Sequence, residues 1–122
     1  MTRSLGGRVV WLVLAGLAAA TACTSSGAPQ PASADSGETA CSVLRRIPDP
    51  FPDLPTGGAT GTPYDLNAHR LAAARLLAAD AAGTDAARRP LADALEGAFR
   101  ALTQSQEMSE GQTHLAEARR HC

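Results

Sequence analysis

Residues 91–102 read LADALEGAFRAL, and this stretch decides the fold class. Its apolar side chains recur at intervals of three and four residues, the spacing of one face of an α-helix. This is the strongest periodic pattern after residue 23, and it predicts a core-facing helix that begins at Pro90, a residue suited to a first helical turn. The positions of this face are Leu91, Leu95, Ala98, Phe99 and Leu102.

A second helix is predicted upstream of this stretch, from Pro63 to about Ala82. Thr62 precedes it as a cap, and Asp65 stands at the third position, as in a capping box. Gly83 is a typical residue for the end of a helix. The face expected to meet the core consists of Leu66, Ala73, Leu76 and Leu77.

Two further segments join these helices into a small bundle. A short helix is expected over residues 39–46, ended by Pro48. Residues 48–63 hold four prolines in their first eight positions, which forbids a helix and favours extended geometry. We expect a crossing loop whose Phe51 and Leu54 pack on the helices. The alternative is a proline-rich epitope for a binding partner.

Residues 103–111 are polar and allow two interpretations. They form a turn, after which Ser109 and Gln112 make the capping box of a fourth helix, or one long helix continues to His121. No stretch alternates in the manner of a strand. The sequence thus predicts an all-α fold, a small bundle of three to four helices with a proline-rich crossing loop.

The first 23 residues have the three parts of an export signal. Arg3 and Arg8 supply positive charge, residues 9–20 are apolar, and small residues at 20–22 precede Cys23. The apolar run is shorter than the roughly 20 residues that a permanent membrane-spanning helix needs.

The run Ala20-Thr21-Ala22-Cys23 resembles the lipobox of bacterial lipoproteins, with Ala20 where Leu is usual. That resemblance implies a signal peptide over residues 1–22, cleavage before Cys23 and attachment of diacylglycerol to its thiol. It also implies a chain held at the extracytoplasmic face of the cell membrane. Residues 23–39 are rich in Ser, Gly, Ala and Pro, which predicts a disordered tether before a helical domain over residues 40–122.

Three cysteines in an exported chain leave one without a partner. If lipidation takes Cys23, then Cys41 and Cys122 remain to form a disulfide that ties the two ends of the domain together. The competing possibilities are two free thiols, or a bond from Cys122 to another molecule.

The charge balance argues against a nucleic-acid partner. After residue 22 the chain has nine Arg, no Lys and twelve Asp and Glu, a net charge of −3 with neutral His. The absence of Lys is typical of a high-GC genome, such as an actinobacterial one. One interpretation of the Arg pairs 45–46, 88–89 and 119–120 is contact with anionic lipid headgroups. Because acidic residues neighbour them and the net charge is negative, we interpret them instead as solvated helix ends.

No set of residues points to catalysis, a metal or a cofactor. His114 and His121 lie about 10.5 Å apart along a straight helix, too far to share one ion. Glu117 is expected to pair with one of them at the surface. No nucleophile motif surrounds the Ser residues, and the glycines at 57, 58 and 61 lack a phosphate-binding pattern.

These observations favour a non-enzymatic lipoprotein that binds an unidentified envelope protein. The alternative function is a small-ligand carrier with a pocket between helices. That pocket would be lined by Leu66, Leu76, Phe99 and Leu102.

Overall fold

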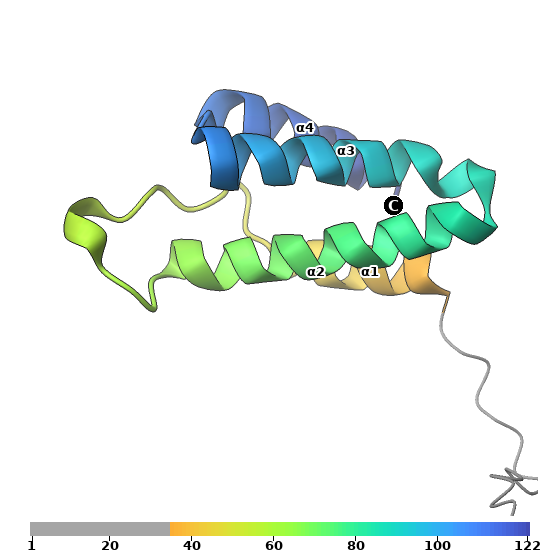
Figure 1. Cartoon of the computed structure of the whole chain (residues 1–122), viewed down its shortest axis with the longest axis horizontal. Coiled ribbons are helices and arrows are strands. Elements are labelled where there is room, and N and C mark those ends of the chain that lie inside the picture. Colours follow the sequence, from red (N-terminus) through yellow and green to blue (C-terminus); the bar gives the residue numbers. More distant parts are fainter. Residues whose placement is uncertain (1–34) are drawn as a thin grey trace, which may run out of the picture.

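The computed structural model describes residues 35–122, and in that part of the chain it contains helices and no strand. The predicted all-α bundle is confirmed. Figure 1 shows the arrangement, in which consecutive helices run in opposite directions. The four α-helices are α1 (Ser36–Leu44), α2 (Pro63–Thr84), α3 (Arg89–Phe99) and α4 (Met108–Arg120).

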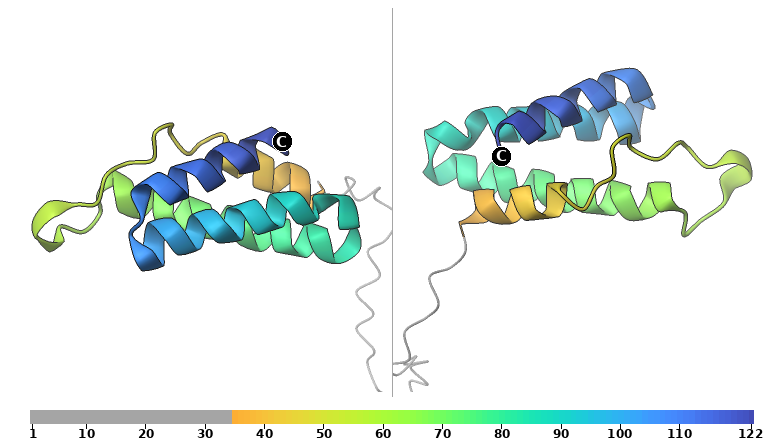
Figure 2. Two further views of the ribbon diagram at one scale, coloured as in Figure 1. Left: turned by 90° about the horizontal axis from the view of Figure 1, so that it is seen from above. Right: turned by 180° about the vertical axis from the view of Figure 1, so that it is seen from behind.

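Helix α2 is the longest element, and it holds the bundle together. It packs against α1 on one side and α3 on the other, while α3 packs against α4. The views in Figure 2 show α1 beside only part of α2 and α4 crossing over α3. At about 1.5 Å per residue, the 22 residues of α2 extend over about 33 Å.

The helix boundaries differ from the sequence-based ones in informative ways. α1 begins at Ser36 because Asp35 caps it, accepting a hydrogen bond from the Gly37 N–H at 3.0 Å. Residues 36–39, assigned above to the tether, therefore form the first turn of a helix. Helix α2 continues through Gly83, the residue expected to end it, and stops at Thr84, with Asp85 as its C-cap.

The polar stretch after residue 102 is a break between two helices rather than one long helix. A π-helical turn, Arg100–Ser105, follows α3, and Gln106 then adopts a left-handed conformation with φ 57°. Glu107 begins α4 without a side-chain cap, so the expected capping box of Ser109 and Gln112 does not form.

The crossing loop is fastened to the bundle by Phe51, as the packing interpretation of this segment predicted. Phe51 is 2% exposed and meets the ring of Tyr64 edge to face, with centroids 5.6 Å apart. The Gln112 side chain accepts a hydrogen bond from the Phe51 N–H at 3.1 Å and donates one to its carbonyl at 3.2 Å. The Tyr64 hydroxyl donates to the Leu102 carbonyl at 2.5 Å. Leu54 is half-buried against the same core.

The core contains side chains from all four helices and the loop. Phe99, expected in it, is half-buried at its edge, with the Arg75 guanidinium 4.5 Å above its ring. The largest fully buried side chains are Phe51, Leu44, Leu71, Leu91, Leu95, Leu102 and Leu115.

Candidate interaction surface

The most distinctive surface of the described chain is the side of α2 that points away from the bundle. Two large apolar side chains lie there in solvent, Leu66 at 52% and Leu76 at 61% exposure. We call this surface the outer face of α2. Its six exposed positions repeat in steps of three and four residues, and they are Leu66, His69, Ala73, Leu76, Asp80 and Gly83.

This finding corrects the sequence-based assignment of the core face. Leu66, Ala73 and Leu76 were expected to face the core, and all three are exposed; Leu77 is half-buried. Leu66 and Leu76 therefore do not line a pocket between the helices, as the alternative carrier function would require. The side of α2 that does meet the core consists of Tyr64, Asn67, Leu71, Ala74, Ala78 and Ala81.

The inner face is defined by small residues and by Tyr64. Alanines at 74, 78 and 81 let α1 and α3 approach α2 closely, and Leu71 fills the space between them with no exposed surface. A buried Tyr hydroxyl needs a hydrogen-bond partner, and the Tyr64 hydroxyl has one in the Leu102 carbonyl. Since α2 carries apolar residues around its whole circumference, its Leu spacing alone could not select between two faces.

Polar contacts border the outer face on both sides. Toward α1, the Ser36 hydroxyl donates to Asp80 Oδ2 at 2.6 Å. Toward α3, Arg75 pairs with Glu96 at 2.8 Å, and the hydrogen bond from Arg75 is the main reason that the pKa of Glu96 lies below its usual range. Apolar side chains bordered by polar contacts are typical of a protein interface with a polar rim.

A shallow hollow of about 580 Å³ adjoins the N-terminal end of the outer face. The capping box predicted there is present: Asp65 Oδ2 accepts from the Thr62 N–H at 3.0 Å, and the Thr62 hydroxyl accepts from the Asp65 N–H at 3.3 Å. The bond from the Thr62 N–H is the first cause of the lowered pKa of Asp65. The hollow is lined by Thr60, Gly61, Thr62, Asp65, Leu66 and His69.

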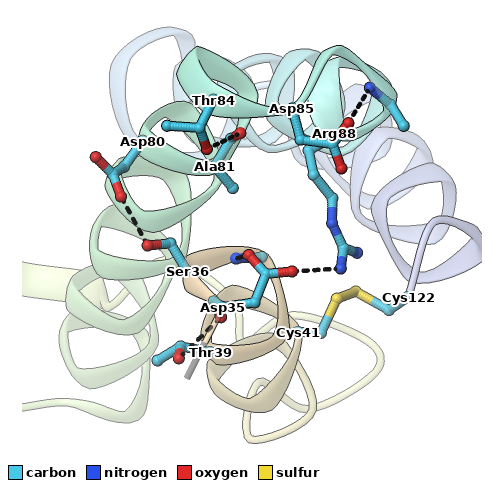
Figure 3. Close-up of polar contacts among 12 residues, drawn as sticks. Asp35, Ser36, Thr39, Cys41, Asp80, Ala81, Thr84, Asp85, Arg88 and Cys122 are labelled. Carbon is cyan, nitrogen blue, oxygen red and sulfur yellow. Dashed lines mark hydrogen bonds and ion pairs between the residues drawn. A yellow bond between two sulfur atoms is a disulfide. The ribbon is translucent and has the colours of Figure 1, made fainter. Parts of the chain in front are cut away.

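The far end of the bundle is joined by a disulfide. Cys41 of α1 and Cys122 lie with their sulfur atoms 2.04 Å apart and their Cα atoms 5.6 Å apart, in agreement with the pairing expected from the sequence. Figure 3 shows Arg88 and Asp35 beside this bond, their side chains 2.6 Å apart. A Cβ on Gly37 would come within 2.7 Å of Arg88 Nε, so that glycine allows the guanidinium to cross the first turn of α1.

Two of the arginines interpreted as solvated helix ends are instead partly buried, and each bonds to a distant segment of the chain. Arg88 fixes the start of α1 through Asp35. Arg119 donates to the carbonyls of Ile47 and Pro48 at 3.3 and 3.2 Å, which fastens the crossing loop to α4. The neighbouring Arg120 is exposed, as expected. Sequence position could not distinguish these roles, because Arg88 and Arg119 bond to residues more than 50 positions away.

A second hollow, of about 310 Å³, lies between α3 and α4 and is strongly acidic. Asp93, Glu96, Glu107 and Glu110 line it together with Arg100 and His114. A hydrogen bond with Glu110, and repulsion from its charge, raise the pKa of Glu107. Most of these charges contact one another rather than converge on an open position.

The histidines lie in separate places. His114 is 3.5 Å from Glu110, His121 is 2.9 Å from Glu117, and His69 lies on the outer face of α2. The expected surface pairing of Glu117 is thus observed with His121. Among residues 35–122, no three His, Cys, Asp or Glu side chains are grouped so that they could hold a metal ion.

The lipidation site Cys23, the signal over residues 1–22 and residues 23–34 of the expected tether lie outside the described residues. Within residues 35–122, no helix combines the length and the apolar character needed to cross a membrane. Comparison with family models, curated proteins and solved structures finds no match to this chain.

Proposed function

We propose that this chain is a membrane-anchored, extracytoplasmic lipoprotein that binds a protein partner through the outer face of α2. The observation that carries the proposal is the exposure of Leu66 and Leu76 on a helix whose opposite side already forms the core. A lone exposed Leu needs no explanation, but Leu66 and Leu76 lie on one helical stripe with the small residues Ala73 and Gly83, and together they form a surface suited to a second helix.

Energetics support a docking role. Full burial of one Leu side chain is worth about 1.5–3 kcal/mol, and both leucines are more than half exposed. A partner that covers them recovers much of this free energy, while the ion pair of Arg75 and Glu96 at the border stays solvated. In the described chain α2 packs against α1 and α3, and the outer face with its two leucines remains uncovered.

The anchor is proposed from the sequence. The lipobox-like run before Cys23 supports attachment of two acyl chains, which is enough for stable membrane association. The domain would then lie at the membrane, at the end of a short tether that stops at Asp35, where α1 begins. A non-catalytic role is supported by the separation of the three histidines, two of which pair with a Glu on their own helix, His114 with Glu110 and His121 with Glu117.

The anchor is tested by replacing Cys23 with Ser in the full chain. The proposal predicts loss of the lipid in the mass of the N-terminal peptide and loss of the mature product from the membrane fraction. An unmodified Cys23 in the original chain, or cleavage elsewhere, would remove the basis for membrane attachment.

Docking is tested by Leu66→Asp/Leu76→Asp in the full chain. Extraction of membranes with mild detergent, followed by sedimentation, measures the size of any complex that contains the chain. We expect the double variant to sediment as a smaller species. The matched control is Thr113→Asp/Ala116→Asp, which places the same two charges at exposed positions of α4 and should leave the complex intact. A complex unaffected by the double variant would refute docking through this face.

A further inference from the structure

We propose that the partner which covers the outer face of α2 is a second copy of the same chain, with the two α2 helices packed antiparallel about a two-fold axis. This inference rests on the docking role proposed above and names its occupant. It comes from the order of side chains along the face, which is self-complementary in one orientation.

The six positions of the face follow the seven-residue repeat of helices that pack side by side. Leu66, Ala73 and Asp80 occupy one position of the repeat, and His69, Leu76 and Gly83 occupy the other. All six are exposed in the described chain, and Asp80 also accepts a hydrogen bond from Ser36 within its own chain. A stripe of this kind along about 33 Å of helix is long enough for a continuous seam.

Antiparallel pairing matches unlike side chains across the seam. When the axis passes between positions 74 and 75, Leu76 meets Ala73 of the second copy, and Leu66 meets its Gly83. A large side chain thus faces a small one at every apolar layer, which is the size alternation that close packing needs. The hollow beside Leu66 lies where the C-terminal end of the second α2 would arrive.

The remaining layer is polar and also complementary. His69 meets Asp80 of the second copy, so an imidazole N–H faces a carboxylate, and two-fold symmetry repeats the pair at the other end of the seam. The Ser36 hydroxyl occupies only Oδ2 of Asp80, which leaves the other oxygen to accept this bond. A parallel arrangement would instead place His69 against His69 and Asp80 against Asp80, with like charges opposed.

A standard interface buries roughly 800 Å² per partner. A single helix face offers less area than this, so the free dimer would be weak. Anchoring both copies in one membrane raises their effective concentration and compensates for this.

The test uses the full lipidated chain, purified in detergent so that no other protein is present. Micelles are kept in large excess over chains, so that two chains do not share a micelle by chance. Sedimentation velocity over about a hundredfold range of concentration should show a monomer–dimer equilibrium. Leu76→Asp should weaken the dimer by more than about 100-fold, because symmetry introduces the charge twice.

A charge exchange tests the register. His69→Asp places carboxylates opposite each other and should weaken the dimer at least about tenfold, whereas His69→Asp/Asp80→His should restore it to within about threefold. Ser36→Ala controls for the hydrogen bond that Asp80 makes within its own chain and should leave association unchanged. Circular dichroism of each variant checks that the bundle remains folded.

The outcomes separate this inference from the proposed function. A purified chain that stays monomeric at every concentration overturns the dimer. If Leu66→Asp/Leu76→Asp still dissociates a complex from membranes in that case, the docking role stands with a different partner. Dimerisation without rescue by the exchanged pair overturns the antiparallel register.

Discussion

Leu71 and Leu76 lie five residues apart on the same helix and allow a matched test of which side of α2 belongs to the core. Leu71 has no exposed surface and Leu76 is 61% exposed. The same substitution by Ala at both positions keeps the change in helix propensity identical. Any difference in the free energy of unfolding therefore comes from burial.

Leu71→Ala should lower the free energy of unfolding by about 2–5 kcal/mol, the range for a Leu removed from a packed interior. Leu76→Ala should change it by no more than about 0.5 kcal/mol, as expected for a surface position. For a domain of this size, 1 kcal/mol shifts the melting temperature by about 4–8 °C, so the buried variant should melt at least about 8 °C lower.

The assay is thermal and urea unfolding followed by far-UV circular dichroism. Measurements at two protein concentrations are needed, because self-association through Leu76 would make the contribution of this residue to the free energy of unfolding depend on protein concentration. Equal losses at the two positions, independent of concentration, would show that the assignment of the inner and outer faces of α2 is wrong.

Three other outcomes follow from contacts outside α2. Cys41→Ser should lower the free energy of unfolding by up to about 4.5 kcal/mol under non-reducing conditions, because the bond to Cys122 constrains a loop with a sequence separation of 81; a change near zero in the melting temperature would contradict this. Gln112→Ala should cost about 1–3 kcal/mol in urea unfolding, since it removes both side-chain bonds to the Phe51 backbone, and an unchanged midpoint would refute that role. The hydrogen bond from the Gly37 N–H, and then Arg88, lower the pKa of Asp35 in the folded chain. The contribution of Asp35 to stability is therefore complete above about pH 4 and disappears as the pH falls through its folded-state pKa. Asp35→Asn should make the free energy of unfolding fall less steeply at acid pH, and an equally steep fall in the variant and the original chain would exclude this contribution.

The sequence was sufficient for the fold class because several independent signals agreed. All of these signals act locally. The apolar spacing of residues 91–102 corresponds to a helix, the cap at Thr62 to the start of a helix, and the prolines from Pro48 onward to a loop. The pairing of Cys41 with Cys122 was accessible through cysteine parity, although that argument depended on assigning Cys23 to the anchor.

The candidate surface could not be predicted, for a physical reason specific to α2. Alanine fits either a core or a surface, so a helix rich in Ala offers two apolar faces and no periodic contrast between them. The inner face carries Tyr64, whose hydroxyl bonds to the carbonyl of Leu102, 38 residues away, and local patterns do not reveal such a contact. The roles of Arg119 and Gln112 also depend on the path of the crossing loop, which local patterns do not specify.

The most direct test of the central claim is a photo-crosslinking residue placed at position 73 of the full chain in intact membranes. Trypsin cleaves after Arg70 and Arg75, so residue 73 lies on the peptide 71–75 and Leu76 lies on the next peptide, which ends at Arg88. We expect an adduct of two chains in which the peptide 71–75 of one copy, identified by isotope label, is joined to the peptide 76–88 of the other. A control crosslinker at exposed Ala116 should give no such product. The absence of any adduct at position 73 would contradict docking through the outer face of α2, and an adduct to a different protein would contradict the dimer.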